Sequence, residues 1–264
     1  MLRVLMEGAR DPQVNMAIDE ALMKMRPWKG IDILRVYMWS PSGVSIGRAQ
    51  DATNSVDLDE IGKKGFKLVR RPTGGGALLH QEGMEVTYGV VLSSDNPLAK
   101  LMVDESAARI SNGIVKALEF LGIRAEVRRH GIGSRQNLCY LREGSSDVLI
   151  GGRKISGSAQ VRDGKAILQH GTLLLDFDAA TWLSVIRNPG LTQDELVSRV
   201  TWLHEHVDTS AEAAAYAIVN GFSELLNESV LKSALDADER EMATKLYISK
   251  YSKSNWNVNG QAVS

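Results

Sequence analysis

The chain carries three consecutive glycines, at positions 74–76, two residues after a pair of arginines and before an apolar run that ends at His80. Glycine adopts positive φ angles without steric cost and lets the backbone approach a ligand closely. Successive amide N–H groups in such a loop can converge on an anion. A tight turn between strands needs fewer glycines than this. The segment 70–80 therefore predicts a ligand-binding loop that joins two strands.

A second glycine-bearing segment, at 151–159, places Lys154 between small residues and β-forming ones. Most lysines lie on the surface, but the glycines around this one remove bulk, and the adjoining strand can hold its ammonium group at a fixed depth. A fixed cation beside an amide-lined loop suits acyl and phosphate groups. Further along, His170, Gly171 and Thr172 end a strand. They either close the same pocket or supply only a buried core histidine.

Composition excludes several classes of protein. Charged residues make up 24% of the 264 residues and the net charge is -1, which argues against a bulk nucleic-acid binder. The single cysteine, Cys139, cannot form an internal disulfide and fits a reducing compartment. No apolar stretch approaches bilayer length, and the N-terminal apolar run is too short for a signal peptide. We therefore expect a cytoplasmic protein with neither nucleic acid nor membrane as a partner.

Hydrophobic periodicity predicts an α+β chain. The expected helices lie at 14–26, 57–64, 104–121, 181–187, 192–199, 209–227 and 236–251. The expected strands lie at 33–39, 44–47, 66–71, 85–92, 124–129, 147–150, 153–161, 166–169 and 171–177. Pro27 is expected to end the first helix, Asp104 to cap the helix at 104–121, and the first two strands to form a hairpin. Residues from about 180 to 264 are expected to form a mainly helical C-terminal part.

Common catalytic and metal motifs do not account for the chain. Residues 43–47 match the hydrolase pattern G-x-S-x-G, but Ser45 lies inside a strand-like run and no convincing helix follows it. Neither a Walker-type nor a Rossmann glycine motif occurs. The five histidines lack zinc-ligand spacing, so a structural metal is not expected.

A series of segments, in order along nearly the whole chain, resembles the family of lipoate–protein ligases, octanoyltransferases and biotin-ligase-like acyltransferases. The segments lie at 15–21, 34–41, 45–50, 70–80, 152–160, 170–172, 250–252 and 256–257. The resemblance implies one catalytic domain over residues 1–264. Its fold would be a central mixed, mostly antiparallel sheet flanked by helices, as in class II aminoacyl-tRNA synthetases and biotin ligases.

The resemblance further implies an activity. A ligase of this kind uses ATP and Mg²⁺ to convert lipoate to lipoyl-AMP, and then transfers the lipoyl group to a lysine of an acceptor lipoyl domain. The acceptor would be a glycine cleavage H protein or an E2-type domain of a 2-oxoacid dehydrogenase. The chain most resembles short archaeal ligases, which lack the accessory domain of longer ones, so a separate partner subunit is expected to supply that part.

On this template Lys154 binds the acyl carbonyl and the α-phosphate, and Asp147 contacts the nucleotide or Mg²⁺. Arg70 and the glycine-loop amides hold the adenylate phosphate and the acyl chain, while Thr73 and His80 line the loop. The full set expected to bind substrate or adenylate is Arg70, Arg71, Thr73, Gly74, Gly75, Gly76, Ala77, His80, Asp147, Gly157, Ser158, Ala159, His170, Gly171 and Thr172.

Two alternatives stay open. Cys139 stands where cysteine-type octanoyltransferases carry their nucleophile, which implies acyl transfer through a thioester without ATP. Those transferases usually have arginine where this chain has Gly76, and this departure favours the ligase. The other alternative is a lipoate-binding protein without turnover. The sequence does not distinguish lipoate, octanoate and biotin, because the depth of the pocket selects among them.

Overall fold

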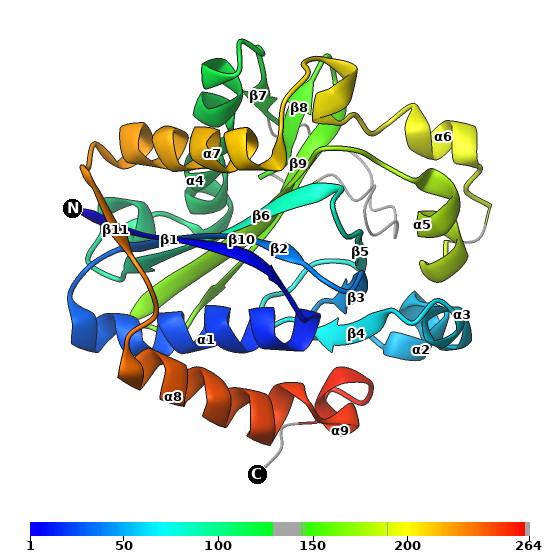
Figure 1. The fold of residues 1–264 in the computed structure, drawn as a ribbon, viewed down its shortest axis with the longest axis horizontal. Helices are drawn as coiled ribbons and strands as arrows, with labels where there is room; N and C mark the ends of the chain where they lie inside the picture. The colour runs from blue at the N-terminus through cyan, green and yellow to red at the C-terminus, as the bar shows by residue number, and fades with distance from the viewer. Residues whose placement is uncertain (129–143, 145, 189, 262–264) are drawn as a thin grey trace.

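The computed structural model describes residues 1–128, 144, 146–188 and 190–261. Its main feature is an eight-stranded sheet in the order β11-β1-β2-β6-β10-β9-β8-β7 (Figure 1). β1 pairs in parallel with β11 and β2, and the other neighbouring strands pair antiparallel. The expected mixed, mostly antiparallel sheet is therefore confirmed. Its strands are β1 (Leu2–Arg10), β2 (Ile33–Trp39), β6 (Glu85–Ser93), β7 (Glu126–Val127), β8 (Val148–Ile150), β9 (Arg153–Arg162), β10 (Ala166–Leu174) and β11 (Val230–Ser233).

Helices cover both faces of this sheet (Figure 1). α4 and α7 pack together on one face, where Ile114 and Phe222 belong to an apolar core shared with the strands. α1 and α8 pack together on the other face. No helix in the described ranges is long and apolar enough to span a bilayer. The α-helices are α1 (Pro12–Lys29), α2 (Ala52–Ser55), α3 (Leu58–Lys63), α4 (Val103–Phe120), α5 (Ala179–Val185), α6 (Gln193–Val197), α7 (Ala211–Leu226), α8 (Ala237–Leu246) and α9 (Ser254–Asn257).

A second, three-stranded sheet has the order β4-β3-β5 and is built from β3 (Gly43–Ile46), β4 (Lys67–Arg70) and β5 (Leu78–His80). The expected hairpin of 33–39 with 44–47 is therefore wrong, because β2 and β3 lie in different sheets. Val44 and Ile46 are buried with Trp182 in an apolar core of their own, which holds β3 beside β4 and β5. A turn pattern specifies that the chain turns but not which sheet it enters next.

The glycine loop does join two strands, β4 and β5. The second of these is the short strand Leu78–His80, which the sequence pattern does not predict. β10 is likewise one strand where two were expected, because Gly171 continues the pairing instead of breaking it. A Cβ at this position would lie 2.6 Å from the carbonyl oxygen of Gly157 and 2.7 Å from the Tyr88 hydroxyl oxygen. Gly171 thus allows close packing within the sheet and is not a turn.

α1 begins and ends at identifiable capping residues. The Asp11 carboxylate accepts a hydrogen bond from the Gln13 amide at 2.8 Å, and Pro12 occupies the first turn. The expectation that Pro27 ends this helix is wrong, because the helix continues to Lys29 and stops at Gly30, whose φ is 70°. Gly30 supplies the left-handed conformation that commonly terminates helices. The proline lies in the last turn.

α4 starts one residue before the expected cap. Met102 occupies the N-cap position without a side-chain hydrogen bond, and Asp104 lies in the first turn. A carboxylate there is stabilised by the positive end of the helix dipole, so acidic residues mark the first turn as well as the cap itself. The sequence signal was therefore sound, but the assigned position was wrong.

The C-terminal third is divided between both faces of the main sheet. α7 packs on α4, and α8 packs on α1. Between them β11 pairs in parallel with β1 at the edge of the sheet. This strand is not predicted, because its four residues are all exposed and carry no alternation of buried and exposed positions. The segment from about 180 onward therefore contributes one strand to the main sheet in addition to its helices.

Candidate active site

A cavity of about 230 Å³ lies against the main sheet, beneath the glycine loop. The strand register forms its floor: Gly157 is opposite Thr172, Thr172 is opposite Thr87, and Thr87 is opposite Tyr37. Directly opposed residues share one face of a sheet. These four positions therefore form a row across β9, β10, β6 and β2. The lining residues are Met16, Tyr37, Trp39, Arg71, Gly75, Gly76, Ala77, Leu78, His80, Thr87, Gly144, Asp147, Lys154, Gly157, Ser158, Ala159, His170, Gly171 and Thr172.

Lys154 sits at the β9 end of this row. Its ammonium group forms an ion pair with Asp147, with Nζ 2.7 Å from Oδ1, and its side chain is 12% exposed. The backbone of Lys154 donates to the Arg199 carbonyl at 2.8 Å and accepts from the Thr201 amide at 2.9 Å. The lysine is therefore fixed both at its backbone and at its charged end, as a preorganised cation requires.

Asp147 holds several groups around this cation. Its other carboxylate oxygen accepts a hydrogen bond from the Gly144 amide at 3.1 Å and lies 3.8 Å from Nε of Arg128. Within the described residues, no group of three or more histidine, cysteine, aspartate or glutamate side chains could hold a metal. The structure thus surrounds Asp147 with a cation and an amide donor, and its expected contact with Mg²⁺ stays a prediction.

Gly157 leaves room for the lysine in its observed position. A Cβ at this position would lie 2.7 Å from Cε and 2.8 Å from Nζ of Lys154. Real Cβ atoms essentially never approach other atoms this closely. Gly157 therefore opens the space through which the Lys154 side chain reaches the cavity.

The glycine loop is held by Arg71. The guanidinium group donates to the carbonyls of Gly74 at 3.0 Å and Gly76 at 2.8 Å. Gly75 between them has a φ of 92°, which glycine alone adopts readily. A Cβ on Gly47 would lie 2.1 Å from the Gly75 carbonyl oxygen, so a second glycine allows this loop conformation. Gly74 and Thr73 do not line the cavity.

Arg70 lies away from the cavity. The residue is 1% exposed, and its guanidinium group donates to five backbone carbonyls. They belong to Gly47, Arg48, Gln50, Trp256 and Val258. This corrects the expectation that Arg70 holds an adenylate phosphate. Successive side chains along an extended chain point to opposite sides, so Arg70 ties the C-terminal segment to β4 while Arg71 reaches the cavity.

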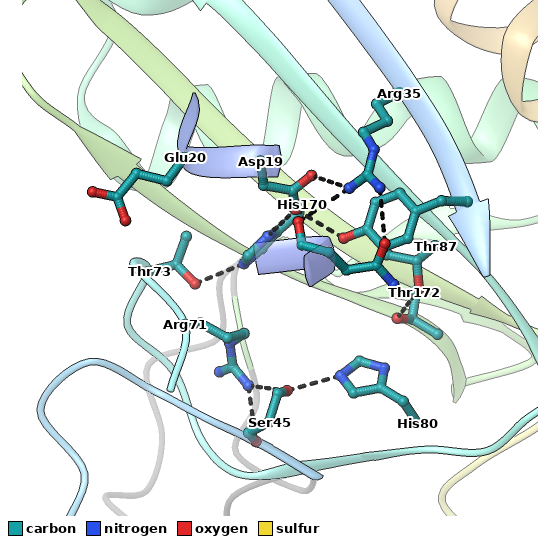
Figure 2. Close-up of polar contacts among 12 residues, drawn as sticks. Asp19, Glu20, Arg35, Ser45, Arg71, Thr73, His80, Thr87, His170 and Thr172 are labelled. Carbon is teal, nitrogen blue, oxygen red and sulfur yellow. Dashed lines mark hydrogen bonds and ion pairs between the residues drawn. The ribbon is translucent and has the colours of Figure 1, made fainter. Parts of the chain in front are cut away.

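His170 connects the cavity to a buried network around Asp19 of α1 (Figure 2). Its Nδ1 lies 3.0 Å from the Asp19 carboxylate, and its Nε2 lies 2.8 Å from the Thr73 hydroxyl oxygen. Asp19 also accepts hydrogen bonds from Arg35 and Tyr37, each at 2.8 Å. His170 therefore lines the cavity and at the same time fixes the start of the glycine loop.

Burial sets the protonation of this network. Desolvation lowers the pKa of His170 below its ordinary value, although the Asp19 carboxylate opposes the shift. Burial alone would raise the pKa of Asp19, but the hydrogen bond from His170 and the charge of Arg35 hold it below the usual value. At neutral pH a neutral His170 thus donates from Nδ1 to an ionised Asp19 and accepts the Thr73 hydroxyl hydrogen at Nε2.

His80 belongs to a second buried network (Figure 2). Its Nε2 lies 2.8 Å from the Ser45 hydroxyl oxygen, and its Nδ1 lies 2.6 Å from Oε1 of Glu85. Arg71 also donates to the Ser45 hydroxyl at 2.7 Å. Ser45 is fully buried and does not line the cavity. The arrangement supports the strand interpretation of residues 43–47 over a serine nucleophile.

Most of the residues expected in the site lie around the cavity. Those that line it are Arg71, Gly75, Gly76, Ala77, His80, Asp147, Lys154, Gly157, Ser158, Ala159, His170, Gly171 and Thr172. The sequence pattern does not predict six further lining residues, which are Met16, Tyr37, Trp39, Leu78, Thr87 and Gly144. Tyr37, Trp39 and Thr87 alternate along predicted strands, but nothing in the pattern indicates which face of each strand meets a ligand. Cys139 lies outside the described residues, so its role stays a prediction.

The cavity, its fixed lysine and the glycine loop can now be compared with known proteins. Residues 11–223 match the lipoyl protein ligase A/B catalytic domain. The chain belongs to this family. It is therefore an enzyme of the lipoyl ligase and transferase group.

Curated relatives align along nearly their whole length. Octanoyltransferase LipM of Kyrpidia tusciae is 36% identical over 97% of this chain and 97% of its own. Octanoyltransferase LipM of Bacillus subtilis is 30% identical over 97% of both chains.

Solved structures share the fold. A lipoate-protein ligase A bound with ATP has a TM-score of 0.85 at 28% identity, covering 98% of both chains. Protein Ta0514 of Thermoplasma acidophilum with bound lipoic acid has a TM-score of 0.83 at 28% identity, covering 97% of this chain and 98% of its own.

Proposed function

We propose that this protein is an octanoyltransferase, which moves an octanoyl group from a carrier-protein thioester to a lysine of an acceptor lipoyl domain. The observation that carries the proposal is the agreement of full-length relatives at 30–36% identity, which are named octanoyltransferase LipM. The ATP-dependent ligase favoured by the sequence is thereby replaced by its alternative. The Gly76 departure now stands as an unexplained difference from the usual arginine of these transferases.

The cavity supports an acyl substrate. Met16, Trp39 and Leu78 give it apolar walls, and Lys154 provides a cation at one end. Its volume of about 230 Å³ is below the roughly 300–1,000 Å³ of pockets for drug-sized ligands, which suits one slim chain. An alkyl chain would bury its surface against these walls while its thioester lies near the ammonium group.

The proposed chemistry has two acyl transfers. The Cys139 thiolate attacks the thioester carbonyl, the bond from carbon to the carrier sulfur breaks, and the carrier leaves as a thiolate that takes up a proton from water. The acceptor lysine amine then attacks the new thioester, forming an amide, and its proton passes to the departing Cys139 sulfur. Lys154 stabilises the oxyanion that develops on the carbonyl in both steps.

The position of Cys139 in the sequence supports this role. The described residues on either side of the segment 129–143 are Arg128 and Gly144, and both contact Asp147. The sequence therefore places the sole thiol between two residues that adjoin the ion pair of Lys154.

A second candidate is the ATP-dependent lipoate ligase with Mg²⁺ as its ion. It is favoured by the likeness to a lipoate-protein ligase A bound with ATP, and by the absence of the usual arginine at Gly76. An acceptor lipoyl domain is proposed for both candidates. It is supported by a bi-partite ligase from Thermoplasma acidophilum, described with its E2 lipoyl domain, which is 28% identical with a TM-score of 0.83.

Modification of an apo-lipoyl domain distinguishes the two candidates. The purified chain is given octanoyl carrier protein without ATP, or octanoate or lipoate with ATP and Mg²⁺, and the acceptor is analysed by mass spectrometry. We expect modification from octanoyl carrier protein alone, with its loss in Cys139→Ala. Modification only with ATP would support the ligase and contradict our proposal. Binding of lipoate without any modification, even with candidate partner subunits, would support the non-catalytic alternative.

A further inference from the structure

Polar side chains form the wall of the cavity that lies across the sheet from Lys154. Counted along the floor, Thr87 lies two strands from Gly157, and Tyr37 lies three strands away. At the usual spacing between strands, the row measures about 14 Å. An acyl chain with its carbonyl at Lys154 and its body along this row directs its methyl end toward Thr87 and Trp39.

The hydrogen bonds of this wall converge on one carboxylate oxygen, Oε1 of Glu85. It accepts from Nδ1 of His80 at 2.6 Å, from the Thr87 hydroxyl at 3.0 Å and from the Thr172 hydroxyl at 3.3 Å. Glu85 is 2% exposed and does not line the cavity, whereas its three donors do. The carboxylate therefore lies behind the wall and draws the polar hydrogens away from the cavity.

The indole nitrogen of Trp39 also has its hydrogen-bond partner within the wall. Nε1 of Trp39 donates to the Thr87 hydroxyl oxygen at 2.7 Å. The Trp39 and His80 rings are stacked, with centroids 3.8 Å apart and planes 13° apart. When the polar atoms of buried side chains hydrogen-bond one another, the carbon atoms of those side chains are what faces a ligand in the cavity. The threonine methyl groups and the ring surfaces are then left to contact a ligand.

We propose that Glu85 is a positioning residue for acyl-chain selectivity, holding the hydroxyl of Thr87 away from the methyl end of the chain. This inference rests on the proposed function in one respect, that the cavity takes an acyl chain. Without an acceptor at position 85, the Thr172 hydroxyl still has the Thr87 hydroxyl oxygen at 3.3 Å, whereas the Thr87 hydroxyl turns toward the cavity. A chain that reaches Thr87 must then cover an unsatisfied hydroxyl.

The effect depends on chain length. Thr87 lies two strand spacings from Gly157, so an octanoyl chain reaches it, whereas a hexanoyl chain ends before it. Loss of the acceptor should therefore weaken octanoate binding by about tenfold while it leaves hexanoate binding within about twofold. A chain with a terminal hydroxyl should lose less than octanoate, because it can bond the freed threonine. Damage to the fold would instead weaken binding of all three acids together.

The test measures binding of hexanoate, octanoate and 8-hydroxyoctanoate by calorimetry for wild type, Glu85→Met and Glu85→Gln. Glu85→Gln keeps an acceptor oxygen, so we expect near wild-type selectivity, while Glu85→Met loses the octanoate preference. Equal losses for all acids in Glu85→Met, or equal effects of the two variants, would overturn the inference. Wild-type protein that binds none of the acids would overturn it as well.

A matched pair at Thr172 keeps the test valid if Glu85→Met does not fold. Thr172→Val keeps the methyl group and should bind octanoate within about twofold of wild type. Thr172→Ser keeps the bonded hydroxyl but loses a methyl, which should weaken octanoate binding by about fourfold. The reverse order would overturn the inference. Failure of octanoyl transfer with these binding results intact would refute the proposed function alone.

Discussion

Replacing Lys154 by methionine separates the catalytic role of the lysine from its structural role. The substitution removes the ammonium group that lies 2.7 Å from Asp147 and leaves a carboxylate that is 3% exposed. Breaking a buried ion pair costs about 3–5 kcal/mol. The Gly144 amide stays at 3.1 Å and Arg128 at 3.8 Å, so we expect the lower end, about 3 kcal/mol.

The assay combines thermal unfolding with the transfer rate. A loss of about 3 kcal/mol corresponds to a decrease in melting temperature of roughly 6–12 °C for a chain of this size. The rate should fall by about 10²–10³-fold, since one preorganised charge stabiliser is lost. In the double variant Lys154→Met with Asp147→Asn, no charge is stranded, so most of the stability should return while the rate stays low.

Two results would refute this reasoning. A Lys154→Met variant with the melting temperature of wild type and near-normal turnover would show that the lysine neither stabilises the fold through Asp147 nor acts in catalysis. A double variant in which rate and stability recover together would show that the lysine serves only to neutralise the carboxylate.

Three further predictions follow from individual contacts. Gly157→Ala places a Cβ 2.7 Å from Cε of Lys154, so the lysine must move, and turnover should fall at least tenfold with little change in melting temperature, both measured on the same sample. Arg70→Met strands five backbone carbonyls and should destabilise the protein by about 2–4 kcal/mol in urea unfolding; an unchanged KM would separate this from a binding role. Because the pKa of His170 is lowered in the folded state, the unfolded chain takes up a proton first as pH falls below about 6.5. The free energy of unfolding should therefore decrease below that pH, and His170→Gln should show a smaller decrease; equal slopes would contradict the assignment of a neutral histidine.

The sequence specifies the parts of the site whose residue types have few alternatives. Three glycines after paired arginines indicate a loop whose backbone approaches a ligand closely. Gly157, near Lys154 in the sequence, indicates that the lysine side chain needs space. Both features lie at the cavity in the structure. They were predictable because a steric requirement for glycine leaves a direct trace in the sequence.

Other parts depend on contacts between distant segments. Arg70 and Arg71 are chemically equivalent in the sequence, and carbonyls from distant segments, those of Trp256 and Val258 among them, hold Arg70 away from the cavity. Glu85 resembles any acidic residue at the start of a strand until β10 brings Thr172 beside it. The predicted hairpin of β2 and β3 is wrong for the same reason. The two strands pack into separate apolar cores, and these cores determine which sheet each strand joins.

The intact mass of the protein after mixing with octanoyl carrier protein tests the proposed mechanism most directly. In the absence of ATP, the account predicts that wild-type protein gains one octanoyl group, that hydroxylamine removes it, and that Cys139→Ala gains none. Acceptor modification that proceeds normally in Cys139→Ala, or acylation that requires ATP, would contradict transfer through a thioester.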